Sequence, residues 1–227
     1  MLYDVFDNDN DTEELETNVN VSDVTEKSPN TGDRLEAVFR YQAELKNKYS
    51  DIERRSGIGL GLLPEVFDLD HPKCQYVLKD YAWRVTEEIG EALAAEEKIH
   101  RWEEIADGLH FLTELCHLAG IGPEDVMHKI DGEDRLATVF DKCEYSGMDR
   151  AVGQFVRSMG MAMNSLKQKP WKQTHFPTDE VEFRSRLARS YIWYVGIAIS
   201  CHMTAEDLFD MYFKKSRVNH FRTRSNY

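Results

Sequence analysis

Apolar residues recur every three or four positions along much of this chain of 227 residues. That spacing matches the period of about 3.6 residues of an α-helix with one buried face. It starts with Leu35, Val38, Phe39 and Leu45, in a helix expected to run to about Tyr49. No stretch alternates convincingly with the period of two that is typical of strands. The sequence therefore predicts an all-α fold, a helical bundle built from antiparallel helix pairs.

Turn and capping residues divide the periodic region into further helices. Pro72 and Pro123 suit first helical turns, Gly120 suits a helix end, and Thr204 with Asp207 forms a capping pair. We expect helices at about 72–97, 102–118, 149–166, 180–201 and 205–221, with another element starting at Pro123. The stretch 56–64 carries three glycines but no P-loop signature, and we interpret it as a connector.

The chain also resembles itself when it is shifted by 82 residues. This shift places Ile105 on Leu187 and Ala106 on Ala188, and it places residues 124–126 on residues 206–208. Apolar positions stay apolar, which is typical of a duplicated unit. We expect a first repeat at about 72–130 and a degenerate second repeat at about 149–221. In this register Glu104 and Asp107 fall on arginines, so one half could do chemistry while the other shapes the pocket.

Charge separates the first 33 residues from the rest of the chain. The whole chain has a net charge of -13, and residues 1–33 contribute ten acidic side chains against a single lysine. Their composition predicts an acidic disordered tail, followed by one domain over 34–227. The acidic balance argues against nucleic-acid binding. The four cysteines are scattered and no signal segment precedes them, which predicts a cytoplasmic protein. No apolar run is long enough to span a membrane, so we expect no membrane association.

Acidic side chains occur at helical spacing on two consecutive predicted helices. Glu87, Glu88 and Glu91 lie on the first helix, and Glu104 and Asp107 lie on the second. Residues three apart share a helix face. Because we expect a short turn near 99–101, the two helices should be antiparallel neighbours that bring four carboxylates together: Glu88, Glu91, Glu104 and Asp107.

Such a cluster needs compensation. Two like charges about 5 Å apart repel by roughly 3 kcal/mol at an effective dielectric constant of about 20. A divalent cation would remove this repulsion, and carboxylate oxygens suit Mg²⁺, with Mn²⁺ as the alternative. The competing interpretation is that the acidic residues only form solvated helix faces. The basic residues after Asp210 likewise fit either a triphosphate site or a helix C-terminus.

These motifs resemble those of the all-α nucleoside triphosphate pyrophosphatases, which include MazG-like enzymes, phage dCTPases and dimeric dUTPases. The pattern Glu-Glu-x-x-Glu followed by Glu-x-x-Asp is similar to their metal-binding motif. Residues 215–222, Lys-Ser-Arg-Val-Asn-His-Phe-Arg, are similar to the closing Lys-x-x-x-Asn-x-x-Arg of the dimeric dUTPase branch, and residues 41–45 are similar to its N-terminal motif. The resemblance covers about 34–227.

The resemblance implies a role for each matching residue. Glu88, Glu91, Glu104 and Asp107 would hold Mg²⁺, with Glu91 and Glu88 as the catalytic pair and Glu91 orienting or deprotonating the attacking water. Glu87 would be accessory. The substrate would be bound by Lys215 and Arg222 at the phosphates, by Asn219, and by Gln42 at the base edge. Lys46 stands where the family usually has Asn.

The expected activity is Mg²⁺-dependent hydrolysis of a deoxynucleoside triphosphate to the monophosphate and pyrophosphate. dUTP is the first expected substrate and dCTP the second. The alternatives are a pyrophosphatase for another or modified deoxynucleotide, as in a phage-like pool, and a non-catalytic helical interaction module. The resemblance further implies a homodimer, in the host cytoplasm if the protein is viral.

Overall fold

The computed structural model describes residues 19–56, 67–129, 132–143, 147–167, 174 and 176–224. Within these ranges the chain forms a short 3-10 helix, eight α-helices and no strand, which confirms the all-α prediction. The elements are η1 (Val21–Asp23), α1 (Arg34–Ser56), α2 (Pro72–Ala94), α3 (Lys98–Leu118), α4 (Pro123–Val126), α5 (Arg135–Lys142), α6 (Met148–Ser165), α7 (Glu180–Ser200) and α8 (Ala205–Arg224). No helix in the described part is long and apolar enough to span a bilayer.

Most helix bounds agree with the sequence expectation, and the differences have local causes. The turn between α2 and α3 lies at 95–97 rather than at 99–101, and α3 begins at Lys98 rather than near Trp102. Arg101 stabilises this turn, because its guanidinium donates to the carbonyls of Ala92 and Ala95. The eight-residue helix α5 was not predicted, since it is too short to show a hydrophobic period. Its start is capped by Asp134.

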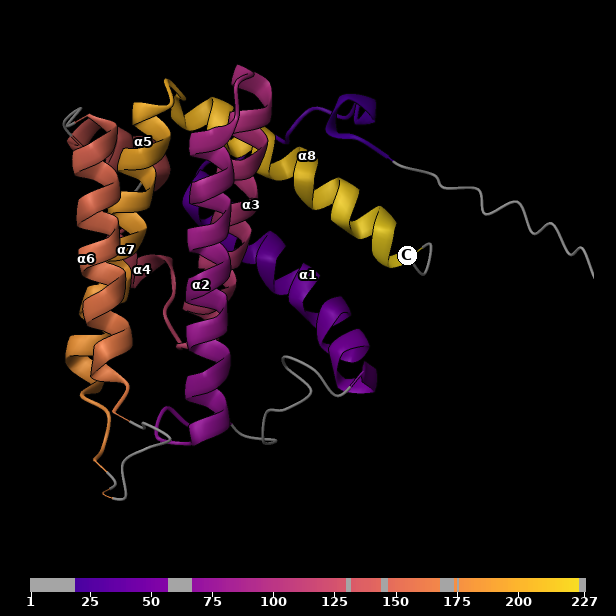
Figure 1. Ribbon diagram of the computed structural model, residues 1–227. Coiled ribbons are helices and arrows are strands. Elements are labelled where there is room, and N and C mark those ends of the chain that lie inside the picture. The colour runs from indigo at the N-terminus through magenta and orange to yellow at the C-terminus, as the bar shows by residue number, and fades with distance from the viewer. Residues whose placement is uncertain are drawn as a thin grey trace, which may run out of the picture.

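Two long antiparallel pairs form the body of the molecule, α2 with α3 and α6 with α7, and Figure 1 shows them standing side by side. Helices α1 and α8 extend away from α3 on the other side and contact each other. One apolar core runs through all of these helices, with Leu78, Leu109, Leu187 and Leu208 fully buried in it. The fold therefore places α1, α2, α3 and α8 around a common space.

One helix of each pair matches its counterpart in length and at its C-terminal end. Helices α3 and α7 each have 21 residues and begin 82 positions apart, at Lys98 and Glu180. Gly120 follows α3 with φ of 67°, and His202 follows α7 at the same displacement with φ of 60°. The amides three residues after each helix end, those of Ile121 and Met203, then donate back to the carbonyls of Cys116 and Ala198. Both helices therefore end in the same left-handed capping motif.

Close contacts join the two pairs. Gly108 of α3 lies so near to α7 that a Cβ there would overlap the hydroxyl of Tyr194. That hydroxyl donates to the carbonyl oxygen of Ile105 over 2.8 Å, and Trp102 donates to the carbonyl of Cys201 over 2.9 Å. Because buried polar groups need partners, these bonds fix the distance between the halves.

The boundary between an acidic tail at 1–33 and a domain at 34–227 stays a prediction, and residues 1–18 lie outside the described part. Residues 19–33 contact the body: Val21 is buried against the core, Arg217 pairs with Glu26 at 2.8 Å, and Ser28 donates to Asp210. The glycines at 57, 59 and 61 lie outside the described residues.

Candidate active site

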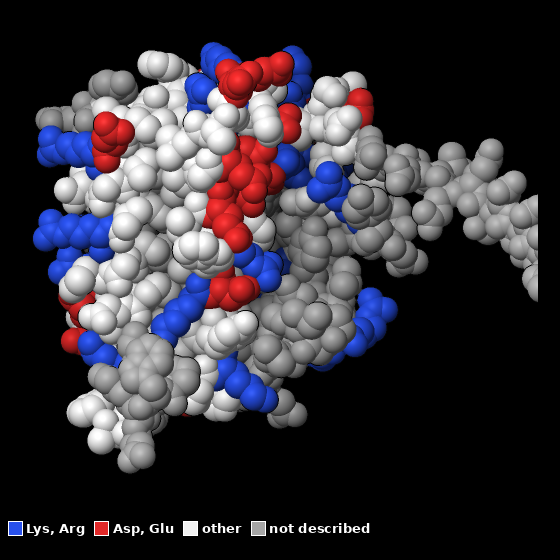
Figure 2. Space-filling view, viewed as in Figure 1, with Lys and Arg blue, Asp and Glu red and all other residues white. Residues whose placement is uncertain are grey.

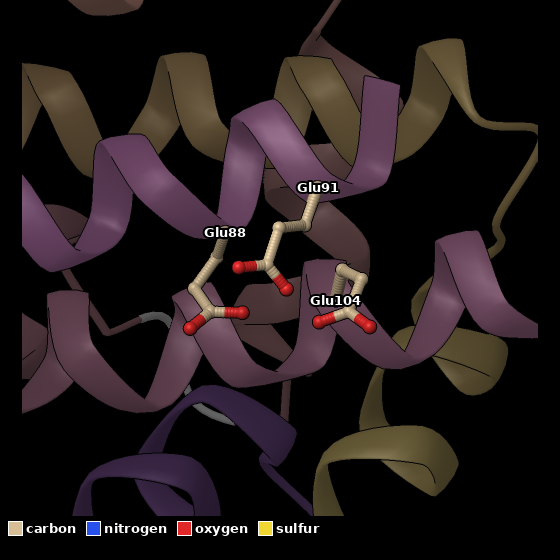
Figure 3. A group of neighbouring side chains, drawn as sticks. All are labelled: Glu88, Glu91 and Glu104. Atoms are coloured by element: carbon tan, nitrogen blue, oxygen red, sulfur yellow. The ribbon is translucent and has the colours of Figure 1, made fainter. Parts of the chain in front are cut away.

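Three carboxylates converge between α2 and α3. Glu88 and Glu91 lie one turn apart on α2, and Glu104 comes from the facing turn of α3 (Figure 3). One oxygen of each lies within 4.8 Å of one oxygen of each of the others. Glu91 is exposed, Glu88 is half-buried and Glu104 is buried. The cluster therefore lies at the edge of the core, where one side remains open to solvent.

The electrostatics of the cluster favour a bound cation. Burial, together with the neighbouring charges of Asp107 and Glu104, raises the pKa of Glu88 to about 8. Burial likewise raises the pKa of Asp107 to about 6, although the ammonium of Lys215 opposes this shift. Carboxyl groups that disfavour their own ionisation in this way gain most from a nearby positive charge.

Basic groups already approach part of the cluster. His100 Nε2 lies 2.7 Å from Glu104 Oε1, one turn away on α3. Lys215 Nζ of α8 lies 2.5 Å from Asp107 Oδ2, and both side chains are largely buried. The contact brings α8 against the acidic helix pair, so residues more than a hundred positions apart form one site.

A cavity of about 330 Å³ opens beside the carboxylates and is bounded by α1, α2, α3 and α8. Acidic side chains gather over α2 and α3, with basic ones next to them, as Figure 2 shows. The cavity is lined on its polar sides by Gln42, Lys46, Arg84, Glu88, Asp107, His110, Glu114, Asn219 and Arg222. Tyr81 and Phe111 supply apolar walls. A cavity of this size with a few convergent polar groups can hold a nucleotide.

The structure places the predicted site residues at two neighbouring locations. Glu88, Glu91 and Glu104 form the carboxylate group. Gln42, Glu88, Asp107, Asn219 and Arg222 line the cavity, and Lys215 is paired with Asp107. Glu87, which we expected to be accessory, does not belong to the carboxylate group. It accepts a hydrogen bond from Trp83 Nε1 over 2.7 Å.

Gln42 is buried and held from several sides. Its amide nitrogen donates to Glu114 Oε2 over 3.2 Å. Its amide oxygen accepts from the Tyr212 hydroxyl over 3.0 Å and lies 2.8 Å from His110 Nδ1. The Gln42 side chain therefore orients other groups at the cavity wall, in addition to lining the cavity itself.

His110 is a site residue that the sequence analysis missed. It is buried on α3, it stacks on the ring of Tyr212 at a centroid distance of 4.0 Å, and burial lowers its pKa to about 3, so the ring is neutral. Because Gln42 presents its oxygen to Nδ1, the hydrogen lies on Nδ1 and Nε2 is an acceptor. Nε2 is buried with no hydrogen-bond partner among the described residues. Its position three residues after Asp107 is the only sequence signal for it.

The donor set fits a hard divalent cation. All three converging groups offer carboxylate oxygens, which are the ligands that Mg²⁺ and Mn²⁺ prefer. Neither a cysteine nor a histidine belongs to this group within the described residues. Burial and the neighbouring carboxylates together raise the pKa of Glu88, and a bound cation would relieve the repulsion between these carboxylates.

Comparison with known proteins gives one match. A family model described as dUTPase matches residues 92–227. The matched region contains Glu104, Asp107, Lys215, Asn219 and Arg222, whereas Gln42, Glu88 and Glu91 precede it. Neither the search of curated proteins nor the search of solved structures found a match. The model covers more than half of the chain, and together with the all-helical fold it shows that this chain belongs to the dUTPase family.

Proposed function

We propose that this protein hydrolyses dUTP to dUMP and pyrophosphate, with a divalent cation, at the cavity beside Glu88. The observation that carries the proposal is the convergence of Glu88, Glu91 and Glu104 next to a nucleotide-sized cavity that also has basic walls. An acidic metal site and a cationic phosphate site are the two parts that phosphoryl chemistry needs side by side.

Mg²⁺ is the proposed cofactor, with Mn²⁺ as the alternative, and Glu88, Glu91, Glu104 and Asp107 would hold it. When bound, the ion would neutralise charge on the triphosphate and lower the pKa of water. Glu91 is the exposed member of the group, so it can reach a water molecule on the open side and orient or deprotonate it. Glu88 supports this role from the half-buried side.

Residues of α8 would bind the phosphates. Lys215, Asn219 and Arg222 are four and three positions apart, which places them along one face of the helix. Asn219 and Arg222 line the cavity. Lys215 contacts Asp107 at the acidic side of the cavity. Arg222 offers a bidentate fork and Lys215 a point charge, so both suit phosphate oxygens.

His110 and Gln42 would read the base. His110 Nε2 is closed off from solvent, so a base at this wall of the cavity would have to displace neighbouring side chains to place the N3–H of uracil on it. N3 of cytosine carries no hydrogen and would face Nε2 as a second acceptor. Gln42 acts by holding His110 in the required tautomer, since its oxygen accepts from Nδ1. This arrangement supports dUTP over dCTP, which remains the second candidate substrate.

The family branch and the oligomeric state are part of the same proposal. We place the chain in the MazG-like superfamily near the phage dCTPase and dUTPase branch, on the motifs at 87–107 and 215–222. A homodimer is supported by the exposed aromatic side chains of Tyr76 and Trp83 on α2, because exposed apolar surface favours association.

A panel of deoxynucleoside triphosphates tests the proposal, with monophosphate and pyrophosphate measured separately. We expect dUTP to be the fastest substrate with Mg²⁺ and turnover to stop in excess EDTA. Equal amounts of dUMP and pyrophosphate should appear. Release of inorganic phosphate instead, or no turnover of any deoxynucleotide with Mg²⁺ or Mn²⁺, would refute the proposed reaction and favour a non-catalytic role.

A further inference from the structure

A second cavity, of about 300 Å³, lies between α6 and α7. Three arginines line it, Arg157 from α6 and Arg186 and Arg189 from α7, together with Gln154 and the indole of Trp193. It belongs to the other helix pair and shares no lining residue with the cavity proposed for dUTP.

The positive charge at this cavity is only partly neutralised. Arg186 pairs with Glu182 at 2.7 Å, one turn earlier on α7. Arg157 and Arg189 are exposed, and neither has an ion pair or hydrogen bond with any described residue. No acidic residue occurs in the sequence between Asp149 and Asp179, or between Glu182 and Glu206. The chain as a whole is acidic, with a net charge of -13, so a basic surface here is a local feature. Figure 2 shows basic side chains along the edge that α6 forms in Figure 1.

The cavity occupies the position that corresponds to the acidic cluster in the other pair. The displacement of 82 residues that relates α3 to α7 places Glu104 on Arg186 and Asp107 on Arg189. On the facing helix α6, Gln154 and Arg157 line the same cavity. The two acidic residues of α3 thus correspond to two arginines of α7, and α6 adds a third arginine and an amide.

We propose that this cavity, the arginine cavity, is a second binding site that holds a small phosphate-bearing anion without any metal ion. Guanidinium groups bind phosphate oxygens through paired N–H donors, and they need no cation to bridge the two charges. Gln154 adds a neutral donor at the same wall. The acidic cluster needs a cation before it can bind phosphate, whereas the arginine cavity binds phosphate directly.

The ligand that suits this site is a diphosphate or the phosphate of a nucleotide. Inorganic pyrophosphate would use the arginines alone. A nucleotide such as dUMP would also stack its base on Trp193, since arginine and aromatic side chains together suit both parts of the ligand. The two sources share one phosphate chemistry, and the contribution of Trp193 distinguishes them.

Titration calorimetry in EDTA, on the full chain with no divalent cation present, tests the site. Inorganic pyrophosphate and dUMP are the two probes. We expect binding to wild type, and a loss of affinity of about tenfold or more in the double variant Arg157→Gln/Arg189→Gln. Arg150→Gln is the matched control, because Arg150 is an exposed arginine of α6 that does not line the cavity. It should bind as wild type does.

Lys215→Gln separates this site from the dUTP cavity, because it removes a cation there and none at the arginine cavity. Affinity in EDTA should stay within about twofold in Lys215→Gln. If Trp193→Ala weakens binding of dUMP but not of pyrophosphate, the ligand is a nucleotide. If Trp193→Ala leaves binding of both probes unchanged, the arginines alone recognise the ligand, as expected for pyrophosphate. If the double variant loses its cooperative melting, the single variants Arg157→Gln and Arg189→Gln take its place, each with an expected loss of about threefold.

Two results would overturn the inference. One is that neither probe binds wild type at millimolar concentration in EDTA. The other is that binding is lost in Lys215→Gln and kept in the arginine variants, which would assign it to the dUTP cavity. Neither result bears on turnover of dUTP with Mg²⁺, so the proposed function and the arginine cavity can fail separately.

Discussion

The two helix pairs of this protein share their architecture and differ in their charge. Helices α3 and α7 have equal lengths, equivalent starts and the same left-handed ending. Beside the apolar stripe, however, the first pair carries Glu104 and Asp107 where the second carries Arg186 and Arg189. The comparison teaches that the apolar positions fix the packing of such a pair, while the polar positions next to them are free to take opposite chemistry.

Neutralising one carboxylate of the first pair should have the largest effect on activity. Glu104→Gln keeps the shape of a buried side chain but removes one of three converging charges. We expect turnover of dUTP with Mg²⁺ to fall by about 10³-fold, because a missing ligand weakens both metal and triphosphate binding. Release of dUMP measures this.

The matched control is the equivalent position of the second pair. Arg186→Gln changes the residue that lies 82 positions after Glu104, at a cavity separate from the proposed site. Turnover should stay within about twofold of wild type. Equal losses in the two variants would show that the pairs do not divide their roles in the way described.

Two buried glycines, one in each pair, test how tightly the helices pack. In Gly108→Ala the new methyl group would overlap the Tyr194 hydroxyl, so we expect a loss of about 3 kcal/mol in the free energy of unfolding. In Gly196→Ala the methyl group meets only Ala151 and Trp193 at ordinary contact distances of 3.8 Å. That variant should gain up to about 1 kcal/mol from helix propensity. Urea unfolding of both variants measures the difference, and a destabilised Gly196→Ala would contradict it.

The stability of the first pair should depend on pH through His110. Its pKa is lowered to about 3 by burial, with Lys215 and His220 adding to the shift, while an unfolded histidine titrates near 6.5. The unfolded state therefore binds more protons between these values, and stability falls as pH is lowered below about 6.5. From pH 7 to pH 5 we expect a loss of about 2 kcal/mol from this group.

His110→Gln isolates that contribution. The second pair has Ile192 at the corresponding position and makes no such contribution. Denaturant unfolding of wild type and variant at both pH values gives the difference in their pH dependence. If the two proteins lose the same free energy over this range, His110 is not the buried neutral group described.

The smallest expected effect is on Lys215, where α8 contacts the first pair. Lys215→Gln removes the ammonium that lies 2.5 Å from Asp107 Oδ2. We expect KM for dUTP to rise about tenfold, since one phosphate contact is lost while the carboxylate cluster stays. Arg217→Gln is the control, because Arg217 is exposed and pairs with Glu26 instead. A large fall in kcat with unchanged KM would contradict the assignment.

Much of this fold could be predicted from sequence because its helices are long and strongly periodic. Helices α2, α6, α7 and α8 begin within a residue of the expected positions. Helix α2 begins at Pro72, and α7 and α8 begin beside the capping residues Asp179 and Thr204. Helix α5 escaped prediction for a physical reason. Its Arg135 is fully buried, a position that becomes favourable only when Asp33 and Glu36 at the start of α1 and Glu124 of α4 surround it.

The residues of the candidate site that repeat at helical spacing could be predicted from sequence. Those whose role depends on contacts with other helices could not. Glu88, Glu91 and Glu104 could be placed together because spacing and antiparallel packing determine their faces. His110 could not, because its spacing of three residues from Asp107 does not distinguish it from a histidine that only packs in the core. Its role depends on the Gln42 oxygen and the Tyr212 ring, which come from helices at opposite ends of the chain.

The pairing of Lys215 with Asp107 also has a consequence for local opening of the molecule. Helix α8 contacts α1 and α3, and its Asn219 and Arg222 form one wall of the cavity. Detachment of α8 would therefore remove this wall and leave the Asp107 carboxylate without its ammonium partner, even while the two long helix pairs stay folded.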